Sequence, residues 1–232
     1  MIRRAISIVA VLGLCFVVVS PAVGGSTKVA GCGVKPFSYA GLQADDTAHG
    51  VAATLTTTAT PLVADGHVGG WIGLGGTKAG PGGEAEWLQA GFASFATEGT
   101  SEMYYEVALP GSKPQYVELA SAVAPGVKHH FAVLEMSGRT DWWRVWVDGQ
   151  PVSPAIHLPG SGGSWYPQAV AENWNGGTGA CNLYSYRFTD VTLAQANGGV
   201  WRPLKQSLVF QDTGYHVVSL SSSPRDFLAA SL

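Results

Sequence analysis

The chain is poor in charged residues. Only 12% of its 232 residues are Asp, Glu, Lys or Arg, and the formal net charge at pH 7 is −3. The 13 Lys and Arg are scattered along the sequence, so there is no basic patch of the kind that neutralises phosphates in nucleic-acid-binding proteins. We therefore exclude nucleic acid as a partner.

Segments with the periodicity of an amphipathic helix are also scarce. The 31 glycines and 8 tryptophans, with many short alternating segments between turn residues, are typical of an all-β protein. A hydrophobic content of 46% is sufficient for a proper core. About a dozen strands are expected, and we predict one domain at residues 25–232: an antiparallel two-sheet jelly-roll β-sandwich. We expect it to be a monomer.

The N-terminal segment has the pattern of an export signal. Arg3 and Arg4 precede an apolar stretch at residues 5–19, which is shorter than the roughly 20 residues of a membrane-spanning helix. We predict a signal peptide at residues 1–24, a secreted mature protein and no integral membrane span in that mature form. The alternative is a lipid anchor at Cys32, because Val29-Ala-Gly-Cys32 has the form of a lipobox.

Cysteine is nearly absent, with three in the chain. Cys15 lies in the predicted signal, so Cys32 and Cys181 form an even pair in an oxidising compartment, and we predict a disulfide between them. Such a bond would stabilise the fold by roughly 4 to 5 kcal/mol in the chain-entropy model. The six histidines are dispersed, and we expect no metal site and no cofactor.

The segment Glu86–Phe95 is predicted to be a strand with an unusual polar residue. Trp87 and Gln89 share one face of it with two small residues, Gly91 and Ala93. An amide side chain in such an apolar segment suggests a catalytic or binding role for Gln89. In the next predicted strand, residues 102–109, Glu106 similarly shares a face with Tyr104.

A partner for Gln89 is predicted in the strand at residues 166–174. Val170, Glu172 and Trp174 share a face of it, which we expect to point inward. A glutamic acid in aromatic, partly dry surroundings has a raised pKa and can exchange protons with a water molecule and a leaving amine. A neutral carboxamide beside it can orient the water and donate an N–H to the developing oxyanion.

Four motifs, in this order, carry a family resemblance. They are Trp71-Ile-Gly-Leu, Leu88-Gln-Ala-Gly91, Tyr104-Tyr-Glu106 and Ala171-Glu-Asn-Trp174, and 83 positions (172 − 89) separate Gln89 from Glu172. Over residues 37–220 the chain resembles the glutamic peptidases, or eqolisins. It departs from them at Gly75 and Ala93, where that family carries acidic residues.

The resemblance implies a concanavalin A-like β-sandwich and a secreted acid endopeptidase that acts on polypeptides. It implies that Gln89 and Glu172 are the catalytic pair. The side chains expected to contact the substrate are those of Trp71, Trp87, Tyr104, Glu106 and Trp174.

Two other classes of function remain open at this stage. Sandwiches of this type also host glycosidases, in which Glu106 and Glu172 would be the two carboxylates of a retaining enzyme acting on a polysaccharide. A non-catalytic, lectin-like or envelope-associated binding protein is the third possibility. The role of Gln89 separates them, because only the peptidase mechanism requires it.

Overall fold

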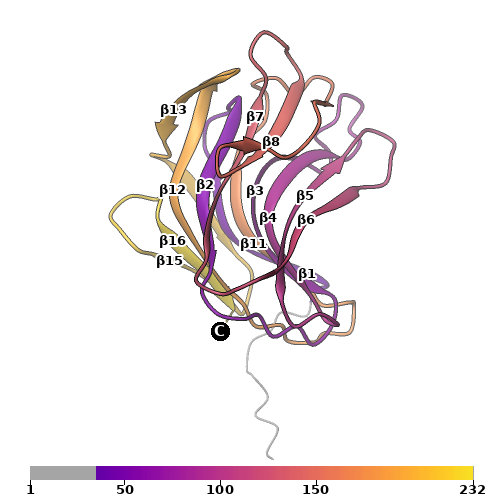
Figure 1. The fold of residues 1–232 in the computed structure, drawn as a ribbon, viewed down its shortest axis with the longest axis vertical. Coiled ribbons are helices and arrows are strands. Elements are labelled where there is room, and N and C mark those ends of the chain that lie inside the picture. The colour runs from indigo at the N-terminus through magenta and orange to yellow at the C-terminus, as the bar shows by residue number, and fades with distance from the viewer. Residues whose placement is uncertain (1–34, 232) are drawn as a thin grey trace, which may run out of the picture.

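Two antiparallel β-sheets packed face to face make up the protein, as Figure 1 shows. The structure, a computed structural model, describes residues 35–231. The predicted all-β, two-sheet sandwich is confirmed. The predicted signal peptide at residues 1–24 and Cys32 lie outside the described residues, so secretion, the lipid-anchor alternative and the disulfide between Cys32 and Cys181 stay predictions. Within residues 35–231 no helix is long and apolar enough to cross a membrane.

The first sheet has seven strands in the order β14-β1-β11-β3-β4-β5-β6. Their bounds are β1 Phe37–Ala44, β3 His67–Gly76, β4 Glu86–Phe95, β5 Ser101–Ala108, β6 Gln115–Val123, β11 Gln168–Trp174 and β14 Ser207–Gln211. Strands distant in sequence are therefore neighbours, because β11 lies between β1 and β3.

The second sheet has nine strands, with β10-β8-β7-β2-β12-β16-β15 in order, β13 paired with β12 and β9 with β8. Their bounds are β2 Gly50–Thr57, β7 Lys128–Glu135, β8 Trp142–Val147, β9 Gln150–Pro151, β10 Ile156–His157, β12 Ser185–Ala196, β13 Gly199–Pro203, β15 Tyr215–Ser219 and β16 Phe227–Ser231.

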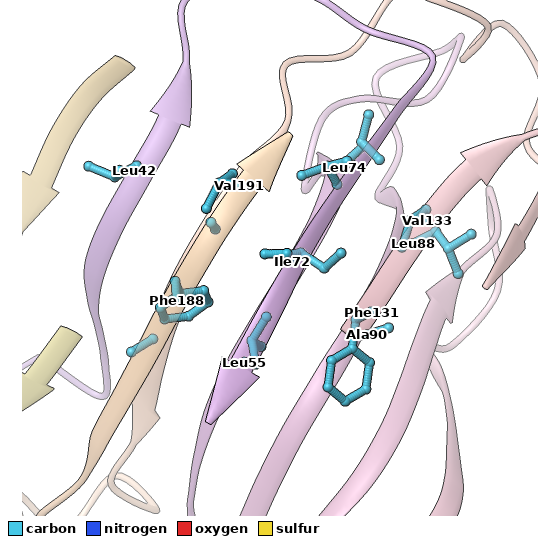
Figure 2. Packing of buried hydrophobic residues seen from close by; sticks show 14 of the residues in the cluster. Leu42, Leu55, Ile72, Leu74, Leu88, Ala90, Phe131, Val133, Phe188 and Val191 are labelled. Atoms are coloured by element: carbon cyan, nitrogen blue, oxygen red, sulfur yellow. The ribbon is translucent and has the colours of Figure 1, made fainter. Parts of the chain in front are cut away.

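The core lies between the sheets and is built by period-two alternation. Leu88 and Ala90 of the first sheet meet Phe131 and Val133 of the second, as Figure 2 shows. Strand β8 alternates strictly, with Trp143 fully buried between half-exposed neighbours. Most of the large apolar side chains are thereby removed from water, which is the main stabilising term of the fold.

Several strands differ from the prediction. The sequence of residues 182–193 predicts two short strands, 182–188 and 191–193, but the structure has one strand, β12, from Ser185 to Ala196, with an irregularity in its pairing to β2 between Thr189 and Thr192. Asp190 there has a φ of 55°, which lets the strand bend and then resume. Strands β13 and β16 follow turn-rich sequence whose alternation is too short to predict them.

The direction of Glu172 also differs from the prediction. Ala169 and Ala171 of β11 face the core between the sheets, so Val170, Glu172 and Trp174 face the opposite side of the first sheet. Val170 is nevertheless fully buried, because Trp71, Ala93 and Tyr104 form a second apolar cluster with it on that side. The candidate site lies on this outer face of the first sheet, which is itself partly buried.

Candidate active site

The floor of the site is formed by β1, β11, β3, β4 and β5, whose registers align side chains into three rows. The Gln89 row consists of Gln168, Gly73, Gln89 and Glu106. The Glu172 row consists of Tyr39, Glu172, Gly69 and Ala93. The aromatic row lies between these two and consists of Val170, Trp71, Gly91 and Tyr104.

A groove of about 840 Å³ lies over these rows. Six of the seven predicted site residues line it, namely Trp71, Trp87, Gln89, Tyr104, Glu106 and Glu172. The seventh, Trp174, does not line it and instead stacks on Phe37 and packs against His67, which do. The groove therefore gathers two carboxylates, two amides and a wall of aromatic rings on one face.

Gln89 and Glu172 face the same groove, and no hydrogen bond joins them directly among those of residues 35–231. They stand two strands apart and four positions apart along the strands, since Gln89 pairs with Gly73 and Glu172 with Gly69. In a regular sheet this separates their backbones by about 10 Å across the strands and about 13 Å along them. The hydrogen bonds of the described residues join each to a different aromatic side chain.

The two aromatic side chains lie between Gln89 and Glu172 and extend the hydrogen bonds of each towards the other. Gln89 Nε2 donates to the hydroxyl of Tyr104 over 3.2 Å, and the indole N–H of Trp71 donates to Glu172 Oε2, also over 3.2 Å. A Cβ placed on Gly69 would lie 3.6 Å from Tyr104 Oη and 3.6 Å from Trp71 Cδ1. We call these two hydrogen-bonded pairs the Gln89–Tyr104 arm and the Trp71–Glu172 arm. Both arms reach the space over Gly69, which has no side chain to fill it.

Burial and like charge shape the electrostatics of the groove. Burial raises the pKa of Glu106, and the Glu172 carboxylate raises it further, while the Trp87 indole and His67 act in the opposite direction. Burial likewise raises the pKa of Tyr104 well above its ordinary value, with Glu172 as the next cause. The groove therefore favours the protonated forms of Glu106 and Tyr104 beside Glu172.

The carboxylate pair of the glycosidase alternative is less well matched to this sheet. Glu106 and Glu172 lie three strands and four positions apart. A regular sheet separates their backbones by about 14 Å across and about 13 Å along the strands. The register does not favour the roughly 5 to 5.5 Å between carboxyl groups that a retaining glycosidase uses.

Several groove residues were not identified from the sequence. They are Phe37, Tyr39, His67, Phe95, Tyr116 and Gln168. Gln168 could have been found, because it precedes Glu172 by four positions on the same strand face. The others depend on which strands are neighbours, and His67, with Nε2 3.5 Å from Glu172 Oε1, reaches the site only because β3 pairs with β11.

No metal centre accompanies the groove in the described part of the chain. Among residues 35–231, no group of three or more His, Cys, Asp or Glu side chains is placed to hold a metal ion.

Known proteins resemble this chain in structure but not in sequence. No protein-family model matches it, and no curated protein matches it in sequence. A scytalido-glutamic peptidase bound to a peptide-based transition-state analogue superimposes with a TM-score of 0.54 at 16% identity, covering 84% of this chain and 97% of that one. A tripeptide complex of an eqolisin-family peptidase gives a TM-score of 0.49 at 17% identity, covering 84% and 96%. A porphyranase from Zobellia galactanivorans gives 0.35 at 9% identity, covering 79% and 60%. At these identities, the first of the three supports a common fold.

Proposed function

We propose that this protein is a secreted endopeptidase that hydrolyses polypeptides at acidic pH, with Glu172 as its acid–base residue and Gln89 as its amide partner. The observation that carries the proposal is the convergence of the Gln89–Tyr104 and Trp71–Glu172 arms over Gly69. The space above Gly69 is bounded on one side by a carboxylate and on the other by a hydroxyl held by an amide. Such groups can hold a water molecule and a scissile carbonyl by hydrogen bonds.

The reaction follows from this arrangement. Glu172 accepts a proton from the water molecule while the water oxygen bonds to the carbonyl carbon. The carbonyl oxygen thereby becomes an oxyanion. Hydrogen-bond donors on the Gln89–Tyr104 arm stabilise that charge. Glu172 then returns the proton to the amide nitrogen as the C–N bond breaks, so that one water molecule is consumed and a carboxylic acid and an amine are released.

The walls of the groove support a polypeptide substrate. Phe95 and His67 contact each other with ring centroids 5.6 Å apart beside Glu172, and Tyr116 stacks on Tyr104 at the other side. These rings offer apolar surface to the side chains of an extended peptide. Glu106, whose pKa is raised, can donate a hydrogen bond from its protonated carboxyl to a backbone carbonyl of the substrate in acid.

The decisive experiment measures cleavage by the secreted, purified protein. A denatured protein substrate is incubated between about pH 2 and 6, and the rate is compared with those of Glu172→Gln and Gln89→Ala. We expect both variants to lose at least about 100-fold, the usual cost of removing an oxyanion donor or its equivalent. Glu118→Gln and Gln115→Ala, on the exposed edge strand β6, are matched controls expected to stay within about twofold. No cleavage by the unmutated protein, or equal rates for all variants, would refute the peptidase mechanism.

A second candidate function is the binding of polypeptides without cleavage. The observation in its favour is that no hydrogen bond of residues 35–231 joins Gln89 to Glu172, and that the residue facing Gln89 across Gly73 is another amide, Gln168. This function predicts that the groove binds an extended peptide and that the peptide is recovered intact. Isothermal titration with an unfolded peptide taken from the sequence of that protein substrate, followed by mass spectrometry of the recovered peptide, separates the two candidates.

A further inference from the structure

The hydroxyl group of Tyr104 accepts one hydrogen bond, and its own O–H remains available as a donor. It accepts from Gln89 Nε2 over 3.2 Å, and no acceptor for its own O–H is found among the hydrogen bonds of residues 35–231. The residue is only 3% exposed. A buried hydroxyl usually donates as well as accepts, so an unused donor at the edge of a groove indicates a place for a ligand acceptor.

The direction of this donor is set by the surrounding residues. The ring of Tyr104 stacks on Tyr116, with centroids 4.8 Å apart and planes inclined by 15°, and the hydroxyl of Tyr116 is in turn hydrogen-bonded to Glu102. Gln89 occupies one lone pair of the Tyr104 oxygen. The remaining open side is over Gly69, whose Cβ position is 3.6 Å from that oxygen.

The same space is where Glu172 acts in the proposed function. Glu172 is the cross-strand neighbour of Gly69, and Trp71 fixes its carboxylate through the indole N–H. A carbonyl group over Gly69 would have Glu172 on one side and the Tyr104 hydroxyl on the other. Gln89 lies a further hydrogen bond away, behind the hydroxyl.

We propose that Tyr104 is the hydrogen-bond donor that contacts the oxyanion of the substrate, and that Gln89 is a positioning residue that acts through it. This inference rests on the proposed function, because it assigns the donor within that reaction. Tyr104 donates a hydrogen bond and keeps its proton, so the balance of the reaction is unchanged. Burial and the neighbouring carboxylates raise its pKa well above the ordinary value, so the hydroxyl is a donor throughout the acidic range.

The kinetic test is a double-mutant cycle on Tyr104 and Gln89. For Tyr104→Phe we expect kcat to fall about 100- to 1,000-fold with KM changed only a few-fold, because the donor acts on the transition state. Gln89→Ala should add less than about threefold to the loss in the Tyr104→Phe protein, since the group it positions is already absent. Tyr105→Phe, whose ring is buried on the core face of the same strand, is the matched control and should keep its kcat. A near-normal kcat for Tyr104→Phe, or full additivity with Gln89→Ala, would overturn the inference.

A binding test separates this inference from the proposed function. Two peptides are compared by calorimetry at about pH 4: one carries a hydroxyethylene unit in place of a peptide bond, and the other is its deoxy analogue. We expect the unmutated protein to bind the hydroxyl-bearing peptide about 10-fold more tightly, and Tyr104→Phe to bind the two equally.

Binding with this difference but without cleavage of ordinary peptides would refute the peptidase function alone. Equal binding of the two peptides by the unmutated protein, or a difference that survives in Tyr104→Phe, would overturn the role of Tyr104. Failure to bind either peptide would overturn both proposals.

Discussion

Replacing Glu86 by glutamine should remove much of the pH dependence of folding stability. Glu86 begins β4 on the same strand face as Leu88, so its carboxyl group is fully buried at one end of the core. Neither carboxyl oxygen has a hydrogen-bond partner. Burial, then Asp141 and then Glu84 raise its pKa from 4.5 to about 7.

The magnitude follows from that displacement. At 1.36 kcal/mol per pKa unit, a change from 4.5 to about 7 corresponds to about 3 kcal/mol. Below pH 4.5 the carboxyl is protonated in both the folded and the unfolded chain and costs nothing. As the pH rises towards 7 the unfolded chain ionises first, so the free energy of unfolding falls by up to about 3 kcal/mol and then levels off.

The assay is urea unfolding followed by tryptophan fluorescence at pH 4 and pH 8. In Glu86→Gln the side chain at position 86 is uncharged at both pH values. It should match the unmutated protein at pH 4 and exceed it by about 3 kcal/mol at pH 8. Glu118→Gln, an exposed carboxylate on β6, should leave the pH dependence unchanged. If Glu86→Gln retained the full decline in stability between the two pH values, the assignment of that decline to a buried, unpartnered carboxyl would be wrong.

Four further substitutions test other parts of the structure. Gly69→Ala should fold, because the nearest atoms to its Cβ would be Phe92 O at 3.3 Å and two atoms at 3.6 Å, but should lose at least about 10-fold in peptidase rate by filling the space over the site. Gly91→Ala should destabilise the protein by more than about 3 kcal/mol in urea unfolding, because its Cβ would lie 2.0 Å from Gly70 O. Gln168→Glu should leave the cleavage rate at acidic pH within about twofold in the same peptidase assay, because Gln168 faces Gly73 and Gln89, four positions along β11 from Glu172; a rate that rises or falls about 10-fold would move the reacting centre away from Gly69. Asn182→Ala should cost about 2 to 4 kcal/mol in the same unfolding assay, because this buried amide accepts from two backbone N–H groups and donates to Asp65 O and to Asn173.

The sequence predicted individual strands well where alternation was clear. Strand β4 has the predicted bounds, and the faces of β4, β5 and β8 agree with the alternation of their residues. The order of strands was not predictable in the same way. No local pattern requires β11 to lie between β1 and β3, and that placement depends on burial summed over the whole chain.

The candidate site was predictable residue by residue but not as a geometry. Gln89, Glu106 and Glu172 were singled out because polar side chains interrupt apolar faces, and all three line one groove. The predicted pairing of Gln89 with Glu172 depends on register, which places them in different rows. The hydroxyl of Tyr104 and the indole of Trp71 bridge that distance, and a sequence read one strand at a time cannot indicate such a bridge.

The glycines of β3 limit how the groove can change during evolution. At Gly73 a side chain would collide with Gln89 and Leu88, and Gly75 has a φ of 91° with Glu86 O only 2.2 Å from its Cβ position. Gly76 has open space around it, and Gly69 has only ordinary or slightly tight contacts. New specificities can therefore arise on this strand by substitution at Gly76, whereas Gly69 must stay open for the proposed reaction and the backbone itself fixes the depth of the groove at Gly73 and Gly75.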